Sequence, residues 1–370
     1  MFLSSIYLRN IRKHTNSRID FTNKLNYIVG ANGVGKSSVL EAIYYLSTTK
    51  SSATTTDLEV VKIGQDNFTI QGDFIGLTND FVQVNYSVVE NKKTYMLNNK
   101  QVNKFSDVIG KFPVVLLSPD DQKITEGYPA ERRKFIDSVI SQSSRTYLNL
   151  LIEYNRTLKQ RSFLLNRIRE SNHPTHGELD AWSEKLVKSG TEIIKHRIIF
   201  ISEFENYVIE TYKKIIHEKE NPGISYSFLD GNCLGNIEAC FEQMINQRAE
   251  EEIRRGINLV GPHRDDFVFD INGLNLKNYG SQGQHKTFQT VLKFAEYFYL
   301  KDKMKNAPVF LLDDVFGELD AERAKSISNC LSSVGQAIVT LTDFGNFSFL
   351  KIGNGDRVIK MSSSGEISYA

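Results

Sequence analysis

An octapeptide near the start of the chain has the residue types and spacing of a phosphate-binding loop. Its sequence, G-A-N-G-V-G-K-S, runs over residues 30–37 and fits the pattern G-x-x-x-x-G-K-[ST] in full. Glycines let the backbone approach phosphate oxygens closely, and N–H groups at a helix start attract them. Lys36 supplies a cation for the β- and γ-phosphates, and the Ser37 hydroxyl is a Mg²⁺ ligand. The residues predicted to bind ATP are Gly30, Ala31, Asn32, Gly33, Val34, Gly35, Lys36 and Ser37.

A pair of carboxylates far along the chain supplies the second half of this chemistry. Asp313 and Asp314 follow the apolar run V-F-L-L at 309–312. Adjacent carboxylates at a strand end repel each other unless a cation or a proton lies between them. We therefore expect Asp313 to hold Mg²⁺ and Asp314 to polarise the water that attacks ATP.

The elements that must position these groups read as an α/β fold. An apolar strand precedes the loop and a helix follows it. Residues 307–316 and 335–344 read as central strands with a helix at 320–333 between them, an order that predicts a parallel sheet. Residues 57–100 are β-rich, with a hairpin turn at Asn98–Asn99, and 112–119 reads as a short buried strand.

The middle of the chain has helical spacing instead. Apolar residues recur every three or four positions in two stretches, separated by E-S-N-H-P-T-H-G-E at 170–178. This pattern predicts an antiparallel helical hairpin, and Gly190 predicts a break in its second helix. The expected domains are a first part of an ATPase head at 1–122, a helical insertion at 123–247 and a second part of the head at 248–370.

Composition sets limits on the partners and the compartment. Lys and Arg number 45 against 44 Asp and Glu, so any nucleic-acid contact must come from a local patch. The cysteines Cys233, Cys240 and Cys330 form no C-x-x-C pair, which indicates reduced thiols in the cytoplasm. The N-terminal apolar run is too short for a signal peptide, and no run reaches the roughly 18 apolar residues of a transmembrane helix.

A third motif, S-Q-G-Q at 281–284, begins a helical pattern shortly before the carboxylate pair. One interpretation is a plain helix cap by Ser281. The other is that this order of motifs resembles ABC-type ATPase heads, in which a Ser-x-Gly-Gln signature begins a helix at this place. The resemblance predicts the fold class: an α/β, ABC-type P-loop ATPase head, split in sequence, with a helical second domain inserted.

The same resemblance implies roles for further residues. Ser281, Gly283 and Gln284 would face the γ-phosphate of an ATP that is held by Lys36 of a second copy. The segment G-E-L-D at 317–320 resembles a D-loop, which places Asp320 at a dimer interface. Thr342 and Asp343 stand where transporters carry a switch histidine, and Gln122 is our choice for the Q-loop glutamine.

Motifs along nearly the whole chain resemble the RecF family of bacterial recombination mediators. They are S-P-D-D-Q at 118–122, P-A-E-R-R-K-F-I-D at 129–137, G-P-H-R-D-D at 261–266, S-Q-G-Q-H-K-T at 281–287, L-L-D-D-V-F-G-E-L-D at 311–320 and T-L-T-D at 340–343. The chain departs from the family pattern at N-I-R-K-H (10–14), at 48–56, which has little basic character, and at Lys286, where arginine is usual.

The resemblance implies a function. It predicts an ATP-dependent homodimer with weak, DNA-stimulated ATPase activity, ATP and Mg²⁺ as cofactors, and no membrane partner. Its DNA would be single-stranded or carry junctions between single and double strands. With RecO and RecR it would help RecA to load during gap repair, replication restart and the SOS response.

Clusters of basic residues are candidates for the DNA contacts. The predicted contacts are Arg9, Arg12, Lys13, Arg132 and Arg133. Each cluster has a second interpretation, a solvated face or an internal ion pair, because charge runs are common.

Two other functions were weighed for the whole chain. The ATPase subunit of a membrane transporter is disfavoured by Thr342–Asp343 and by the long helical insertion. A tether related to SMC proteins, acting without turnover, needs far longer heptad runs than this insertion provides.

Overall fold

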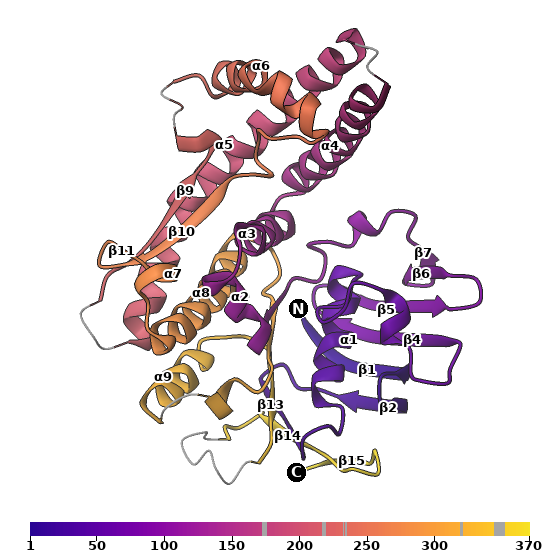
Figure 1. Cartoon of the computed structure of the whole chain (residues 1–370). Helices are drawn as coiled ribbons and strands as arrows, with labels where there is room; N and C mark the ends of the chain where they lie inside the picture. The colour runs from indigo at the N-terminus through magenta and orange to yellow at the C-terminus, as the bar shows by residue number, and fades with distance from the viewer. Residues whose placement is uncertain (172–175, 217–219, 232, 234, 319–320, 344–351) are drawn as a thin grey trace. The chain divides into compact units, whose positions relative to one another are not determined.

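The computed structural model describes residues 1–171, 176–216, 220–231, 233, 235–318, 321–343 and 352–370 (Figure 1). The chain forms two compact units, each of them discontinuous in sequence. Unit 1 comprises Met1–Asp121, Thr211–Glu218 and Thr290–Ala370. Unit 2 comprises Gln122–Glu210 and Lys219–Gln289.

The first sheet of unit 1 is antiparallel. Its described strands, in the spatial order β2-β1-β4-β5-β6-β7, are β2 (His14–Asp20), β1 (Phe2–Ile11), β4 (Asn67–Ile75), β5 (Asn79–Ser87), β6 (Lys92–Leu97) and β7 (Lys100–Gln101). Buried and less buried residues alternate along β4, so one face of the sheet packs on the core. The hairpin predicted at Asn98–Asn99 is confirmed: both residues have positive φ, and Leu97 pairs with Lys100.

The second sheet of unit 1 is largely parallel. Its described strands, in the order β15-β14-β3-β13-β12-β8, are β15 (Ile367–Tyr369), β14 (Arg357–Met361), β3 (Leu25–Val29), β13 (Ala337–Leu341), β12 (Val309–Leu312) and β8 (Val114–Leu117). Among these pairs only β14 and β15 run antiparallel. Leu341 pairs with Val29, and Leu312 pairs with Leu117 and Val339, so the carboxyl ends of these strands meet at one edge. The predicted parallel sheet is therefore confirmed, and its edge collects the residues that follow β3 and β12.

One helix connects the cores of the two sheets. Helix α1 (Lys36–Thr48) contacts β1, β4 and β5 of the antiparallel sheet and β8 and β13 of the parallel sheet. Ile43 and Leu46 of α1 belong to one buried cluster with Phe74 and Ile338. Burying each such side chain contributes roughly 1.5–3 kcal/mol. The position of α1 follows from this apolar burial, and the loop before it is anchored as a result.

Short helices and one amphipathic helix complete unit 1. The remaining described elements are α9 (Ala321–Leu331), the 3₁₀ helices η1 (Asp57–Val60), η2 (Phe105–Asp107), η3 (Pro119–Asp121) and η5 (Val315–Glu318), the end of α5 from Thr211 and the larger part of α8, from Thr290. Helix α9 lies between β12 and β13 in sequence, as predicted.

Unit 2 is mainly helical. Its described helices are α2 (Gln122–Glu126), α3 (Pro129–Ser143), α4 (Arg145–Ser171), α5 (His176–Ile215) as far as Glu210, α6 (Ile237–Arg255), α7 (Leu276–Tyr279) and α8 (Gln282–Lys303) as far as Gln289, with η4 (Leu229–Gly231). Side chains of α4 bond side chains of α5 in reversed order, which makes the two helices an antiparallel hairpin, as predicted. The pairs are Glu153 with Lys185, Arg161 with Ser183 and Arg167 with Glu178.

The break predicted at Gly190 is wrong. Helix α5 continues through this position as one helix of 40 residues. A Cβ at Gly190 would lie 2.5 Å from Phe241, 3.0 Å from Tyr154 and 3.2 Å from Pro262. The glycine therefore serves close packing against α4, α6 and the loop after α6, at a cost of about 1 kcal/mol in helix propensity.

A small sheet shifts the second domain boundary from the expected one. Strand β9 (Pro222–Ser227) pairs antiparallel with β10 (Asp266–Ile271), which pairs with β11 (Leu274–Asn275). These pairings hold the residues after 247 in the helical unit, which extends to Gln289, whereas we expected the head to resume at 248.

Buried charges hold unit 2 together internally. Arg197 is 2% exposed and donates to both carboxylate oxygens of Asp137, at 2.9 and 3.0 Å, and to the carbonyl of Pro262 at 2.8 Å. Arg161 pairs at 2.6 Å with Glu252, which has no exposed surface. Such pairs are costly to break, because removal of one partner leaves a buried unpaired charge.

The cysteines depart from the expectation of three reduced thiols. Cys233 and Cys240 form a disulfide, with their Cα atoms 5.7 Å apart, at the start of α6. Cys330 is unpaired and buried. The spacing of the cysteines did not reveal this pairing. No helix of the described chain combines the length and the apolar character needed to cross a bilayer.

Candidate nucleotide site

The phosphate-binding loop lies between β3 and α1, at the carboxyl edge of the parallel sheet. Gly33 and Gly35 have φ values of 77° and 108°, in the left-handed region that favours glycine. Gly30 has another reason to be glycine, since a Cβ there would collide with the Met361 carbonyl. The three glycines therefore give the loop its shape, as the pattern predicts.

The Lys36 amine lies inside the loop. It donates to the carbonyls of Gly30 and Ala31 at 2.8 and 3.0 Å. Burial lowers the pKa of this amine, while the nearby carboxylates Asp314 and Asp313 act in the opposite direction. The cation is thus held at the loop by backbone oxygens and by the acidic strand end.

The acidic strand end reaches the loop directly. Asp313 follows β12, and its Oδ1 accepts a hydrogen bond of 2.8 Å from the Ser37 hydroxyl. Asp314 follows in the left-handed region, with a φ of 50°. Residues from two distant parts of the sequence therefore meet, as the parallel sheet requires.

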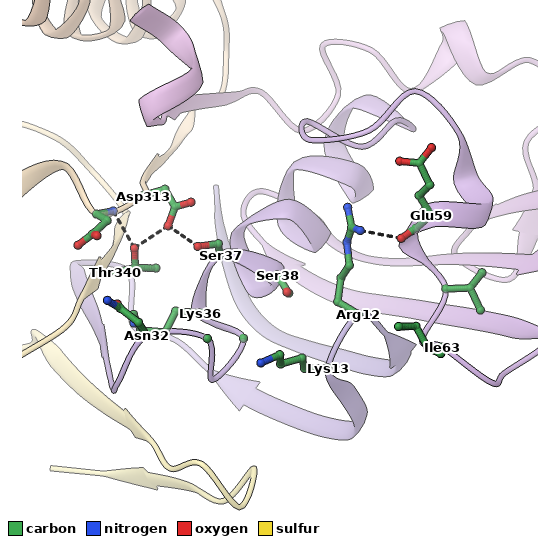
Figure 2. A pocket seen from close by; sticks show the side chains of 14 residues that line it. Arg12, Lys13, Asn32, Lys36, Ser37, Ser38, Glu59, Ile63, Asp313 and Thr340 are labelled. Carbon is green, nitrogen blue, oxygen red and sulfur yellow. Dashed lines mark hydrogen bonds between the residues drawn. The ribbon is translucent and has the colours of Figure 1, made fainter.

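A buried threonine that sequence reasoning gave no role holds both carboxylate residues. Thr340 of β13 has no exposed surface, donates 2.8 Å to Asp313 Oδ1 and accepts 2.9 Å from the Asp314 N–H (Figure 2). The signal in the sequence was that Thr340 is the one polar residue in the otherwise apolar strand β13. It could be used only once β13 was known to lie beside β12.

The oxygen groups at this point fit Mg²⁺. The Ser37 hydroxyl and the Asp313 carboxylate lie within one hydrogen bond of each other, and both are hard oxygen ligands. Within the described residues there is no cluster of three or more His, Cys, Asp or Glu that could hold a metal ion. This arrangement suits Mg²⁺, which usually takes one or two protein ligands and completes its shell with phosphate oxygens and water.

A cavity of about 480 Å³ opens beside the loop (Figure 2). This volume is within the range of small-molecule sites. The cavity is lined by Arg12, Lys13, Asn32, Gly33, Gly35, Lys36, Ser37, Ser38, Glu59, Val61, Ile63, Asp313, Asp314 and Thr340. The sequence analysis did not identify four of these residues, Ser38, Glu59, Val61 and Ile63. Ser38 lies just beyond the loop pattern, and η1 and the residues after it carry no motif.

Two residues predicted to touch DNA, Arg12 and Lys13, line this cavity. Arg12 makes two 3.0 Å bonds to the Glu41 carboxylate and a 2.7 Å bond to the Glu59 carbonyl. Lys13 is exposed, and Figure 2 shows its amine directed toward the phosphate-binding loop. The internal ion pair that we weighed as the alternative is therefore observed for Arg12.

The other predicted DNA contacts lie elsewhere. Arg132 is 5% exposed and bonds both oxygens of Asp266, at 2.7 and 2.9 Å, while Arg133 bonds the Asp265 carbonyl at 2.6 Å. These arginines connect α3 to the start of β10 within unit 2. Arg9 is exposed on β1.

The S-Q-G-Q motif begins α8 with a reciprocal cap. The Ser281 hydroxyl accepts from the Gln284 N–H at 3.2 Å, and the Gln284 side chain accepts from the Ser281 N–H at 2.9 Å. The Gln284 amide also donates to Glu220 at 2.8 Å. The plain helix cap that we weighed is thus present, and Gly283 lies in the first turn of the capped helix.

Gln122 and Asp320 were predicted as the Q-loop glutamine and the D-loop aspartate. Gln122 begins α2, and its amide donates to Glu126 at 2.9 Å. Asp320 lies outside the described residues.

Together the fold and the site define a class of protein. A P-loop and an acidic strand end meet on a parallel sheet, an antiparallel sheet shares its core, and a helical unit carries the S-x-G-Q motif. This is an ABC-type P-loop ATPase head of the kind that SMC proteins carry.

Comparison with known proteins identifies the family within that class. The family model "RecF/RecN/SMC N terminal domain" matches residues 2–363. The DNA replication and repair protein RecF of Salinibacter ruber is 37% identical over 355 residues, covering 94% of this chain and 86% of the relative. The RecF of Chloroherpeton thalassium is 38% identical over 360 residues, covering 95% of this chain and 97% of the relative.

A solved structure agrees with the relatives. "Structure of the recombination mediator protein RecF-ATPrS in RecFOR pathway" superposes with a TM-score of 0.89 at 30% identity and covers 100% of this chain and 98% of that one. The chain belongs to the RecF family.

Proposed function

We propose that this protein is an ATP-dependent DNA replication and repair protein that acts as a recombination mediator, with ATP as its conformational switch. The observation that carries the proposal is the joining of Ser37 and Asp313 by a 2.8 Å hydrogen bond beside the buried Lys36. Family membership over almost the whole chain supports the same function.

The residues of the loop divide the work of nucleotide binding. Backbone N–H groups of the loop and the start of α1 bind the phosphates, and Lys36 stabilises the charge on the β- and γ-phosphates. Ser37 and Asp313 would hold Mg²⁺, which neutralises phosphate charge when it is bound. Asp314 orients the attacking water and accepts its proton. Turnover is weak and stimulated by DNA, because a switch requires a persistent ATP state.

The active form is a head-to-tail homodimer with two shared nucleotides. Ser281 and Gly283 begin a helix of 22 residues, whose N-terminus attracts anions. In the dimer this helix start faces the γ-phosphate held by Lys36 of the second copy, and Asp320 lies at the same interface. ATP therefore stabilises the closed dimer, and hydrolysis opens it.

The dimer binds single-stranded DNA and junctions between single and double strands, and with RecO and RecR it assists RecA loading. Gap repair, replication restart and the SOS response are the settings in which such loading is needed. Arg9 and Lys13 are the predicted DNA contacts that remain exposed. Binding to gapped, single-stranded and blunt duplex DNA, each with and without ATP across a salt series, tests this step. Equal binding to all three forms in the presence and absence of ATP would contradict it.

Light scattering with Mg-ATP tests the switch itself. We expect the wild type to dimerise, Lys36→Ala to lose ATP binding, and Ser281→Arg to bind ATP as a monomer. Ser202→Arg, on an exposed turn of α5, is the matched control and should dimerise normally. The proposed dimer switch is wrong if Lys36→Ala and Ser281→Arg both dimerise on ATP as the wild type does.

A further inference from the structure

A buried histidine lies directly beneath the phosphate-binding loop. His14 begins β2, is 5% exposed and lies 3.1 Å through its Nε2 from the Gly35 carbonyl. Its Nδ1 lies 2.9 Å from the hydroxyl of Ser17, which is 8% exposed. The ring also fills the space under the loop, since a Cβ at Gly35 would lie 2.7 Å from Nε2. His14 thus contacts the loop through Gly35, within unit 1.

The two bonds define the tautomer of the ring. A carbonyl oxygen only accepts, so Nε2 must carry the proton that is shared with Gly35. In the neutral ring Nδ1 is then an acceptor, and the Ser17 hydroxyl donates to it. Burial lowers the pKa of His14, and the nearby Lys62 acts in the same direction, so the neutral form dominates at neutral pH. Ser17 therefore orients the ring, and the ring presents a fixed donor to the loop.

The carbonyl that His14 holds determines the direction of a phosphate-binding N–H. The Gly35 oxygen also accepts the first helical bond of α1, from the Val39 N–H at 3.2 Å. In a trans peptide the C=O and the following N–H point in opposite directions. A Gly35 carbonyl held toward His14 and α1 therefore directs the Lys36 N–H away from the helix, where an anion is bound. Because Gly35 tolerates many backbone conformations, this peptide needs such an external restraint.

We propose that His14 is a positioning residue for the nucleotide: its Nε2–H holds the Gly35 carbonyl, and through that peptide it holds the Lys36 N–H in the phosphate-binding direction. Ser17 takes part by keeping the ring in the donating tautomer. This role deepens the proposed function and rests on it, since the ligand is the phosphate chain of ATP.

The test compares three variants of the full chain by titration with a fluorescent ATP analogue and by single-turnover hydrolysis at saturation. His14→Phe keeps a ring of similar volume but removes the donor, and we expect the Kd to rise about tenfold. His14→Gln offers an amide N–H in place of Nε2–H, and we expect a Kd within about threefold of the wild type. Ser17→Ala removes only the support of the ring, and we expect an intermediate rise. In all three the saturated rate should change by less than about twofold, because the restraint acts on binding.

The controls separate a positioning role from a structural one. His196→Phe makes the same change in α5, within unit 2, and should leave the Kd unchanged. The proposal is overturned if His14→Phe binds the analogue as the wild type does, or if Phe and Gln are equally impaired. Should His14→Phe fail to fold, the comparison of His14→Gln with Ser17→Ala decides, and an unchanged Kd for Ser17→Ala overturns the proposal. A wild type that does not bind the analogue refutes the proposed function instead.

Discussion

The hydroxyl of Thr340 is the sharpest test of how the acidic strand end is built. Thr340→Val keeps the shape of the side chain but removes the bonds to Asp313 Oδ1 and from the Asp314 N–H. Thr340 has no exposed surface, and a methyl group in place of its hydroxyl leaves the Asp314 N–H facing an apolar side chain. A bond to a charged group contributes roughly 1.5–3 kcal/mol, and a buried N–H left unpaired costs roughly 1–3 kcal/mol. Because the two bonds share one oxygen, we expect a combined loss of about 2–5 kcal/mol in the free energy of unfolding of unit 1.

The substitution should also slow hydrolysis. Asp313 Oδ1 accepts hydrogen bonds from Ser37 and Thr340, and without the Thr340 hydroxyl the bond from Ser37 remains. We therefore expect the hydrolysis rate of Thr340→Val to fall about 10- to 100-fold, which corresponds to roughly 1.4–2.7 kcal/mol in the barrier. The measurements are phosphate release, the Kd for Mg-ATP and urea unfolding. Thr340→Ser is the matched control, since it keeps the hydroxyl and loses only a methyl group.

Two outcomes would refute this reasoning. In the first, Thr340→Val retains the turnover and the urea midpoint of the wild type, which means that the hydroxyl contributes nothing. In the second, Thr340→Ser is as impaired as Thr340→Val, which means that the methyl packing is responsible instead of the hydrogen bonds.

Two further predictions concern unit 2. In urea unfolding, Gly190→Ala should lower the free energy of unfolding of unit 2 by roughly 1–3 kcal/mol, because the new methyl group meets Phe241, although alanine favours helices. Gly177→Ala is the control, since nothing lies within 4 Å of a Cβ there, and it should not destabilise unit 2. Burial lowers the pKa of His263 to about 4, below its ordinary value near 6.5, so its contribution to stability is present above pH 6.5 and is lost as the pH falls toward 4. His263→Gln should remove that loss, about 3 kcal/mol at pH 4, from a series of urea unfolding curves; an identical pH profile in the variant would contradict the assignment.

The sequence predicted the nucleotide site well where the chemistry is local. Residues 30–37 need glycines and a lysine at set positions, so the pattern alone identifies the loop. Asp313 could be paired with it because a carboxylate after a short apolar strand belongs at the carboxyl edge of a parallel sheet. The structure places its Oδ1 2.8 Å from Ser37, as that argument requires.

The rest of the site depends on neighbours that only the fold supplies. Thr340 and His14 act through the strands beside them, and neither stands in a motif whose spacing names a partner. For Arg12 the sequence left a DNA contact and an internal ion pair both open, because its partner Glu41 lies 29 residues away in sequence. Gly190 looked like a helix break because its packing partners come from three other segments. In each case the contact that decides the role joins residues far apart in the sequence, and a local sequence pattern cannot predict such a contact.

The order of strands in the parallel sheet has a consequence for synthesis on the ribosome. Strand β3, which carries the phosphate-binding loop, pairs with β13 and β14, and both lie near the other end of the chain. At roughly 5–20 residues per second, β3 waits on the order of tens of seconds for its neighbours to emerge. During that time its apolar face and its unpaired backbone groups remain open to wrong partners. The nascent chain therefore depends on the antiparallel sheet, complete by residue 101, to pack on α1 until the last strands arrive.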